Sequence, residues 1–226
     1  MTDFFITISV WTLPLLLAIT LHEAAHGWAA WKLGDNTAKS LGRVSFNPLV
    51  HIDPFGTIVL PLLLLISQTG FIFGYAKPVP VNFSGLNNPR RDMVLVAIAG
   101  PAANIFLLLI AALLFNILPF MPEVSAKWLG QNLVNMAFIN AILAVFNMLP
   151  IPPLDGGRVA VGLLPDILAR PLSRLEPYGM LVIIMALFVL PMAGQYIGLN
   201  LSVFEYIILP PVEVILNIAN EIATVF

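Results

Sequence analysis

The chain has 226 residues, of which 59% are hydrophobic and 10% charged, and its formal net charge is −2. Because roughly a quarter of the residues in a soluble domain are charged, this composition predicts a membrane protein with several spans. A chain with neither a basic run nor a net positive charge is not expected to bind nucleic acid. The absence of cysteine excludes disulfides, thiolate metal ligands and a cysteine nucleophile.

Helical runs of about 20 apolar residues are long enough to cross a bilayer. The chain has one ambiguous run at 56–73 and five clear ones, at roughly 4–31, 92–118, 131–149, 177–193 and 199–226. We therefore expect an all-α polytopic membrane protein with about five to six transmembrane helices. No positive charge precedes the first run and no cleavage site follows it, so we expect a retained span rather than a signal peptide.

The first run contains the motif His22-Glu23-Ala24-Ala25-His26. Two positions four residues apart share one helix face, so both imidazoles can reach one metal ion. Glu23 can then act on a water molecule at the metal without being a ligand itself. A polar cluster that only joins two helices is the alternative. Ionisable groups at membrane depth are by default functional, which favours the metal site.

Lysine and arginine in short loops mark the cytoplasmic side of a membrane protein. Nine of them form three clusters along the chain, namely Lys32, Lys39 and Arg43, then Lys77, Arg90 and Arg91, then Arg158, Arg170 and Arg174. All three clusters share one side only if the run at 56–73 enters and leaves the membrane by the same face. We therefore favour a re-entrant hairpin there over a sixth full span. Its second half, 71–81, combines strand-forming residues with prolines, as an edge strand does.

Two polar residues in other segments have more than one interpretation. His51, in the proline-bounded loop 47–54, is a candidate metal ligand, proton relay or loop hydrogen-bonder, and we favour the structural role. Asn104 follows Ala99-Gly100-Pro101, whose small residues allow a neighbouring helix to approach closely. Its amide is expected inside the bundle, either pairing two helices or donating toward the metal site.

The run at 131–149 ends in a segment that presents a carboxylate. Asn147 leads into three closely spaced prolines, which end the helix and place Asp155 on an extended, still apolar segment. An Asp before Gly-Gly is most often a turn or helix-cap residue. A catalytic zinc ion, however, commonly takes two His and one carboxylate. Asp155 is the carboxylate whose neighbours suit membrane depth, in contrast to the loop residues Asp53, Asp92 and Asp166.

These motifs resemble the site-2 proteases, a family of intramembrane zinc metalloproteases. The resemblance covers residues 22–158 and rests on three motifs in the family's order: His-Glu-x-x-His, then Ala99-Gly100-Pro101 with Asn104, then Asn147 leading to Leu154-Asp155-Gly156-Gly157-Arg158. The membrane-associated strand of the family looks like Phe73, Gly74, Tyr75, Ala76 and Lys77. The resemblance implies one Zn²⁺ per chain held by His22, His26 and Asp155, with Glu23 catalytic. No PDZ or CBS domain is recognisable, so the resemblance is to a compact form of the family.

A member of that family would be an endopeptidase that cleaves membrane proteins in or near their transmembrane segments, as in regulated intramembrane proteolysis. A substrate helix hides its carbonyls in hydrogen bonds, so cleavage requires local unwinding. The segment 73–81 is expected to hold the freed peptide as an added strand. Asn104 and Asn147 are candidates for contacts with the oxyanion or the substrate backbone.

The alternative functions are a membrane metal-ion transporter and a catalytically inactive protease-like scaffold. A transporter would use Glu23 as a further ligand and repeat its sites, whereas the sequence has one site and no internal repeat. We expect a single membrane-embedded protease domain over 1–226, with a catalytic core at about 4–165 and C-terminal helices at about 177–226. The expected location is a prokaryotic cell membrane, with the active site toward the cytoplasm. The expected partners are the bilayer and a transmembrane substrate.

Overall fold

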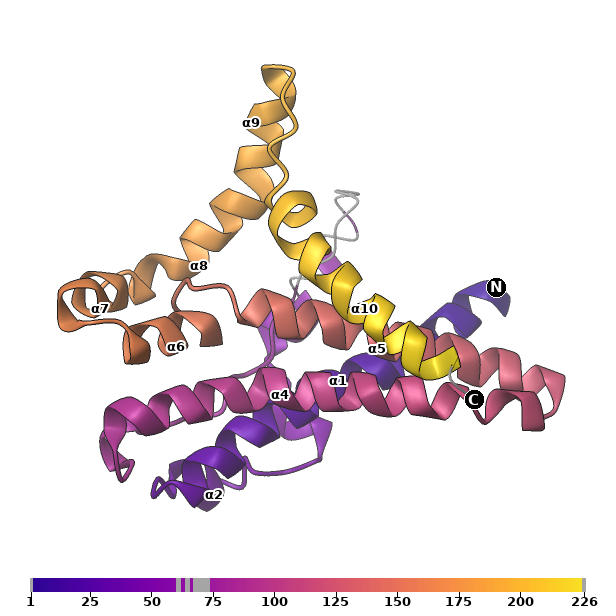
Figure 1. The fold of residues 1–226 in the computed structure, drawn as a ribbon, viewed down its shortest axis with the longest axis horizontal. Coiled ribbons are helices and arrows are strands. Elements are labelled where there is room, and N and C mark those ends of the chain that lie inside the picture. Colours follow the sequence, from indigo (N-terminus) through magenta and orange to yellow (C-terminus); the bar gives the residue numbers. More distant parts are fainter. Residues whose placement is uncertain (1, 60–61, 64–65, 67–73, 225–226) are drawn as a thin grey trace.

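The structure is a computed structural model that describes the chain except for residues 1, 60–61, 64–65, 67–73 and 225–226 (Figure 1). Its described elements are all helical. The α-helices are α1 (Thr2–Lys32), α2 (Thr37–Ser40), α4 (Pro89–Phe115), α5 (Glu123–Asn147), α6 (Asp155–Leu163), α7 (Asp166–Ser173), α8 (Glu176–Ile184), α9 (Leu190–Tyr196) and α10 (Leu209–Thr224). Short 3-10 or π turns are η1 (Pro48–His51), η2 (Pro54–Val59), η3 (Phe83–Gly85), η4 (Leu118–Phe120), η5 (Met185–Val189) and η6 (Phe204–Ile208).

Within the described ranges, five helices are long and apolar enough to cross a membrane: Phe5–Lys32, Pro89–Phe115, Glu123–Asn147, Glu176–Tyr196 and Phe204–Ala223. This confirms the all-α polytopic fold. The third span begins at Glu123 rather than near 131, because the helix continues past the apolar run into a polar turn. There the Lys127 ammonium pairs with the Glu123 carboxylate one turn earlier, at 2.6 Å.

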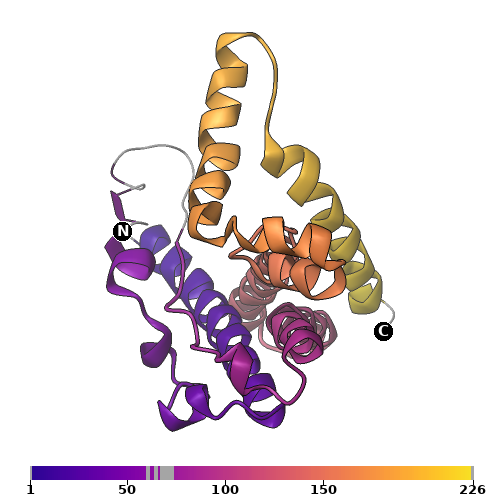
Figure 2. The ribbon, with the colours of Figure 1, turned by 90° about the vertical axis from the view of Figure 1, so that its left-hand side faces the viewer.

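The centre of the fold is the bundle of α1, α4 and α5, which lie against one another, with α10 packed across α4 and α5 (Figure 1). Small residues at the contacts let these helices approach closely. The contact of η6 and α10 with the bundle buries Leu108, Ala112, Ala141, Ile208, Val212 and Ala219. Helices α8 and α9 project away from the bundle in both views (Figures 1 and 2).

The start of the ambiguous run at 56–73 contacts the chain just after the run. The Tyr75 N–H donates to the Gly56 carbonyl at 3.0 Å, and the Thr57 hydroxyl donates to the Tyr75 carbonyl at 2.9 Å. Two ends in contact fit a re-entrant hairpin and do not fit a full span. Residues 60–61, 64–65 and 67–73 of this run lie outside the described part of the chain.

The expected strand at 71–81 forms no ladder over its described part, 74–81. Every second N–H group, those of Tyr75, Lys77 and Val79, nevertheless donates a hydrogen bond within the protein, as in an extended chain. Their acceptors are the carbonyls of Gly56 and His51 and the carboxylate of Glu23. Because these acceptors come from two turns and a side chain rather than from one neighbouring strand, no regular pairing develops.

The chain segments at the Lys32 end of α1 are tied together by hydrogen bonds. Asp35 accepts from the N–H of Thr37 at 2.9 Å and from the N–H of Asn82 at 2.7 Å. Burial would raise the pKa of Asp35, but the bonds from Thr37 and Asn82 outweigh it and lower that pKa, so the group is a carboxylate at neutral pH. On the other side of α4, Arg90 pairs with Asp166 at 2.9 Å. Arg43 donates to the Lys77 carbonyl, and Arg90 and Arg170 share Asp166, so members of all three basic clusters lie close to one another.

Candidate metal centre

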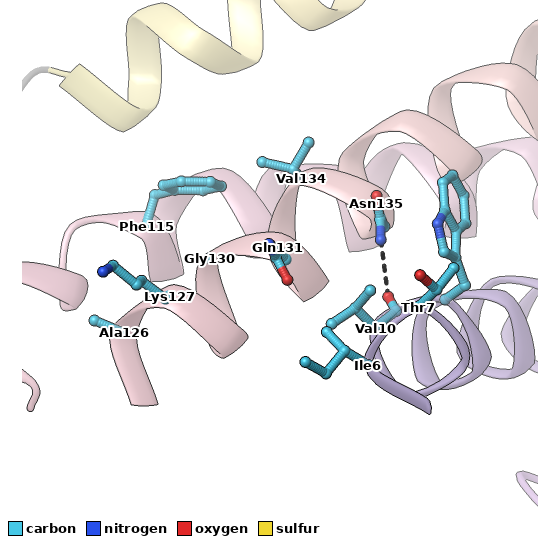
Figure 3. A pocket seen from close by; sticks show the side chains of 11 residues that line it. Ile6, Thr7, Val10, Phe115, Ala126, Lys127, Gly130, Gln131, Val134 and Asn135 are labelled. Atoms are coloured by element: carbon cyan, nitrogen blue, oxygen red, sulfur yellow. Dashed lines mark hydrogen bonds between the residues drawn. The ribbon is translucent and has the colours of Figure 1, made fainter. Parts of the chain in front are cut away.

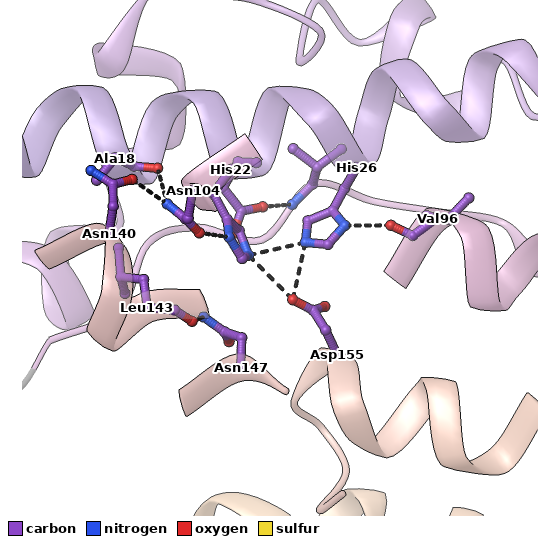
Figure 4. A network of polar contacts seen from close by, with 11 residues as sticks. Ala18, His22, His26, Val96, Asn104, Asn140, Leu143, Asn147 and Asp155 are labelled. Carbon is purple, nitrogen blue, oxygen red and sulfur yellow. Dashed lines mark hydrogen bonds and ion pairs between the residues drawn. The ribbon is translucent and has the colours of Figure 1, made fainter. Parts of the chain in front are cut away.

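Two histidines and one aspartate converge inside the bundle (Figure 4). His22 and His26 lie one turn apart on α1. Asp155 is the first residue of α6 and not part of the extended segment that was predicted for it, because the extended conformation ends at Leu154. The Asp155 Oδ2 atom lies 3.3 Å from the Nε2 atom of each histidine, and the two Nε2 atoms are 3.0 Å apart. All three side chains are buried, and their candidate ligand atoms lie within 4.8 Å of one another.

The other ring nitrogens fix the tautomer of each histidine. The Nδ1 atom of His26 lies 2.7 Å from the Val96 carbonyl oxygen, which can only accept, so this Nδ1 donates. The Nδ1 atom of His22 lies 2.6 Å from the Asn104 Oδ1 atom. Asn104 directs its NH₂ group to the Ala18 carbonyl at 3.2 Å, which leaves its oxygen facing His22. The Nδ1 atom of His22 therefore donates as well.

A neutral imidazole whose Nδ1 donates keeps a lone pair on Nε2. Two such lone pairs and a carboxylate oxygen then face one small space, and the Asp155 Oδ2 atom is buried without a hydrogen-bond donor. Three acceptors at this separation repel one another unless a metal ion or a proton lies among them. The His, His and Asp donor set is the one that catalytic zinc prefers. The residues present therefore fit a zinc ion.

Glycine makes room for this group. A Cβ atom on Gly100 of α4 would lie 2.3 Å from the His26 Nε2 atom and 2.7 Å from the His22 Cε1 atom. The small residues at 99–101 were expected to allow a close approach, and the structure shows that the imidazoles approach there. Gly156 plays a similar part beside Asp155, because a Cβ atom on it would lie 2.2 Å from the Met148 carbonyl oxygen. These glycines let α4 and α6 close on the site.

Glu23 lies partly buried on the same turn of α1, outside the His, His and Asp group. Its Oε2 atom accepts a hydrogen bond from the Val79 N–H at 2.7 Å. The segment that follows the hairpin therefore reaches the carboxylate directly. Nothing in the sequence indicated this contact, because it joins residues far apart in the chain.

The remaining candidates lie in different surroundings. Asn104 is fully buried, and its NH₂ group also donates to the Asn140 Oδ1 atom at 2.8 Å (Figure 4). Asn147 donates to the Leu143 carbonyl one turn earlier at 3.0 Å. His51 is buried away from the metal group, with its Nε2 atom 3.0 Å from the Ser45 carbonyl oxygen. Asn140 was missed by sequence reasoning, although an amide within an apolar run is a usable signal.

A cavity of about 530 Å³ lies at the other end of the bundle, between the start of α1 and the start of α5 (Figure 3). It is lined by residues that include Thr7, Val10 and Gln131. Val10 and His22 are separated by roughly 18 Å along the helix axis. This cavity is therefore separate from the metal centre.

Five membrane-length helices among the described residues, together with a buried His, His and Asp group and a glutamate beside it, define a membrane protein with a zinc-hydrolase type of site. Residues 121–191 match the sequence profile of peptidase family M50. Over 189 residues the chain is 39% identical to the "Putative zinc metalloprotease YwhC" of Bacillus subtilis, covering 82% of each chain. No solved structure matches the chain.

Two relatives named "Putative zinc metalloprotease Rip2" are also similar. The one from Mycolicibacterium smegmatis is 30% identical over 81% of this chain and 67% of its own length. The one from Mycobacterium tuberculosis is 31% identical over 84% of this chain and 71% of its own length. The chain belongs to peptidase family M50, the site-2 protease family. It is a multi-pass membrane zinc metalloprotease, as the resemblance predicted.

Proposed function

We propose that the protein is an intramembrane endopeptidase that cleaves membrane proteins in or near their transmembrane segments, in regulated intramembrane proteolysis. The observation that carries the proposal is the convergence of His22, His26 and Asp155 within the helix bundle. These three residues would hold one zinc ion. We include residues 1–226 in one protease domain, with the core at about 4–165, since α10 packs on α4 and α5.

The chemistry divides between the metal and the protein. When bound, zinc polarises a peptide carbonyl and lowers the pKa of water. Glu23 accepts a proton from this water as general base and then passes it to the leaving amine as general acid. The Val79 N–H holds its Oε2 atom, so Oε1 receives the proton. The Asn147 amide, at the end of α5, is our candidate for a contact with the substrate backbone.

Asn104 has a different part in this proposal. Its oxygen faces His22, and its NH₂ group serves Ala18 and Asn140, so its hydrogen-bonding groups are engaged within the protein. We therefore give it a positioning role in place of a substrate contact. Partners of this kind hold a metal-binding imidazole in the required tautomer and orientation.

The active site faces the cytoplasm in this proposal. His26 and His22 lie roughly 9 and 15 Å inward from Lys32 along α1, and nine of the ten Lys and Arg residues belong to the segments at this end. This distribution supports an orientation with this end inside. A cysteine replacing the exposed Asn87 should react with a membrane-impermeant maleimide only from the cytoplasmic side. Labelling only from the outside would show that the active site faces away from the cytoplasm.

Substrate binding is proposed along the segment after the hairpin. The N–H groups of Tyr75, Lys77 and Val79 are used inside the protein. In an extended chain the N–H of Ala76 then points the opposite way. Pro78 has no N–H to offer further along the same edge. An unwound substrate would therefore add as a strand at Ala76. Phe73, also expected in this strand, lies outside the described residues.

The test compares two substrates in detergent, a single-span leucine and alanine helix flanked by lysines and dye-labelled β-casein as an extended chain. Wild type should cleave both, and a chelator should abolish both activities until zinc is restored. Ala76→Pro removes one outward backbone donor, which is worth about 0.5–1.5 kcal/mol or roughly two- to tenfold in kcat/KM. The loss should be larger for the helical substrate, because this substrate must be held unwound.

Ala76→Val is the matched control, since it changes the side chain and keeps the N–H. Tyr75→Pro is a poorer probe, because it would break the internal bond to the Gly56 carbonyl. Zinc-independent cleavage would contradict the proposed function. If Ala76→Pro cleaves the helical substrate as wild type does, only the strand-addition model is contradicted, and the protease assignment is unaffected.

A further inference from the structure

Arg43 is a buried cation in the loop that follows α2. Arg43 is only 8% exposed, and its Nη2 atom donates to the carbonyl oxygens of Lys77 and Pro78, at 2.7 and 3.3 Å. Among the described residues no carboxylate pairs with it, and its Nε atom is buried without a partner. A buried charge without a counter-ion is costly. The guanidinium therefore does more than fill space, which an uncharged side chain would do at lower cost.

One peptide unit links Arg43 to Glu23. The Pro78 carbonyl oxygen accepts from the Arg43 guanidinium, and the Val79 N–H of the same peptide bond donates to the Glu23 Oε2 atom. A peptide unit is planar, and in the trans form its C=O and N–H point in opposite directions. Holding the oxygen therefore sets the direction of the N–H. A cation on the carbonyl also polarises the unit and strengthens its N–H as a donor.

The neighbouring contacts limit how this peptide unit can move. The Lys77 N–H donates to the His51 carbonyl at 2.9 Å. Proline at 78 fixes the backbone on the N-terminal side of Val79. The Val79 side chain packs against α1 at Gly27, where an added Cβ atom would lie 3.1 Å from the Val79 Cγ1 atom. Gly27 is one turn beyond Glu23, on the same helix face.

We infer that Arg43 is a positioning residue for the reaction: it holds the Pro78–Val79 peptide so that the Val79 N–H fixes the Glu23 carboxylate beside the metal centre. The inference rests on the proposed role of Glu23 as general base. It adds a residue that touches neither substrate nor metal. Glu23 acts in the chemical step, so the effect is expected in kcat. The substrate for the test is an extended chain, because such a substrate depends less on the strand at Ala76, which lies next to the carbonyls that Arg43 holds.

The experiment measures kcat and KM separately for dye-labelled β-casein with the zinc-loaded protein. Arg43→Met should lower kcat by about 10- to 100-fold, the scale of a misplaced catalytic group, with KM within about twofold and bound zinc unchanged. Arg43→Lys keeps the charge but has no fork of donors, so it should recover part of kcat. Arg170→Met is the matched control. It removes an exposed arginine that pairs with Asp166 and should leave both constants unchanged.

A second arm asks whether Arg43 acts through Glu23. In a Glu23→Gln background, Arg43→Met should lower the remaining rate by less than about threefold, since residues acting as a unit are not additive. In the metal-free protein, Arg43→Met should speed hydrogen exchange of the Val79 amide by about tenfold or more. This exchange measurement does not depend on activity.

Two results would overturn the inference: a normal kcat in Arg43→Met, with or without a change in KM, or an equal loss in the presence and absence of the Glu23 carboxylate. Should Arg43→Met not fold, Arg43→Lys decides by the same split between kcat and KM. Full activity of Glu23→Gln would instead refute the proposed role of Glu23, whereas zinc-independent cleavage by wild type would refute the proposed function. An inactive Glu23→Gln beside a fully active Arg43→Met would refute this inference alone.

Discussion

Glu23→Gln should retain zinc and the fold while losing turnover by about 10²- to 10⁴-fold, the range for removal of a general base. The amide keeps the volume of the side chain, and its oxygen can still accept from the Val79 N–H. It cannot take up the proton that the reaction releases. The measurement is single-turnover cleavage of the single-span peptide, together with bound zinc by elemental analysis.

The control for this variant is Glu213→Gln, which makes the same chemical change at an exposed position on α10. It should leave the rate unchanged. Near-normal cleavage by Glu23→Gln would rule out the general-base role. Loss of zinc together with activity would mean that the carboxylate is a ligand, which is the arrangement expected of a transporter.

Asp155→Ala and His22→Ala should each lose zinc. Each removes one of three donors, so the fall in affinity should exceed the roughly 10- to 100-fold that loss of an outer hydrogen-bond partner costs. Competition with a chelator of known affinity measures this fall. His51→Ala is the matched control, because it removes a buried histidine that lies outside the metal group.

Zinc content is the deciding quantity for this prediction. His51→Ala should bind zinc as tightly as wild type, even if its melting temperature falls through loss of the contact with Ser45. Full zinc in Asp155→Ala combined with loss in His51→Ala would transfer the third ligand to His51. Full zinc in every variant would show that the metal is held elsewhere.

Local patterns explain which features the sequence could predict. The His22 and His26 spacing is a property of one helix, so their convergence follows from helical geometry alone. The apolar runs likewise predict spans, because the bilayer sets their length. Asp155 could be predicted from ligand chemistry, because a catalytic zinc ion commonly takes a carboxylate and few carboxylates of this chain lie in apolar surroundings. The structure places Asp155 beside both histidines. Zinc binding by the Asp155→Ala variant tests whether this carboxylate is a ligand.

The features that the sequence did not reveal depend on contacts between distant segments. The Val96 carbonyl orients His26 across 70 residues, and Asn104 meets His22 across 82. No local sequence pattern indicates which backbone carbonyl will accept a hydrogen bond from a histidine. The contact of Val79 with Glu23 is of the same kind. The early start of α5 was missed for another reason, because its first turns are polar and fall outside a hydropathy window.

The positions of these residues along the chain also bear on how the enzyme matures. His26 and Asp155 are about 130 residues apart, and at about 5–20 residues per second the ribosome needs roughly 6–26 s to make that length. Val96 and Asn104 of α4 emerge in the interval. In the proposed ligand set, the imidazoles can therefore be oriented before the carboxylate exists. A nascent chain at that stage has two zinc donors rather than three, so the protease becomes competent only after most of its spans have entered the membrane.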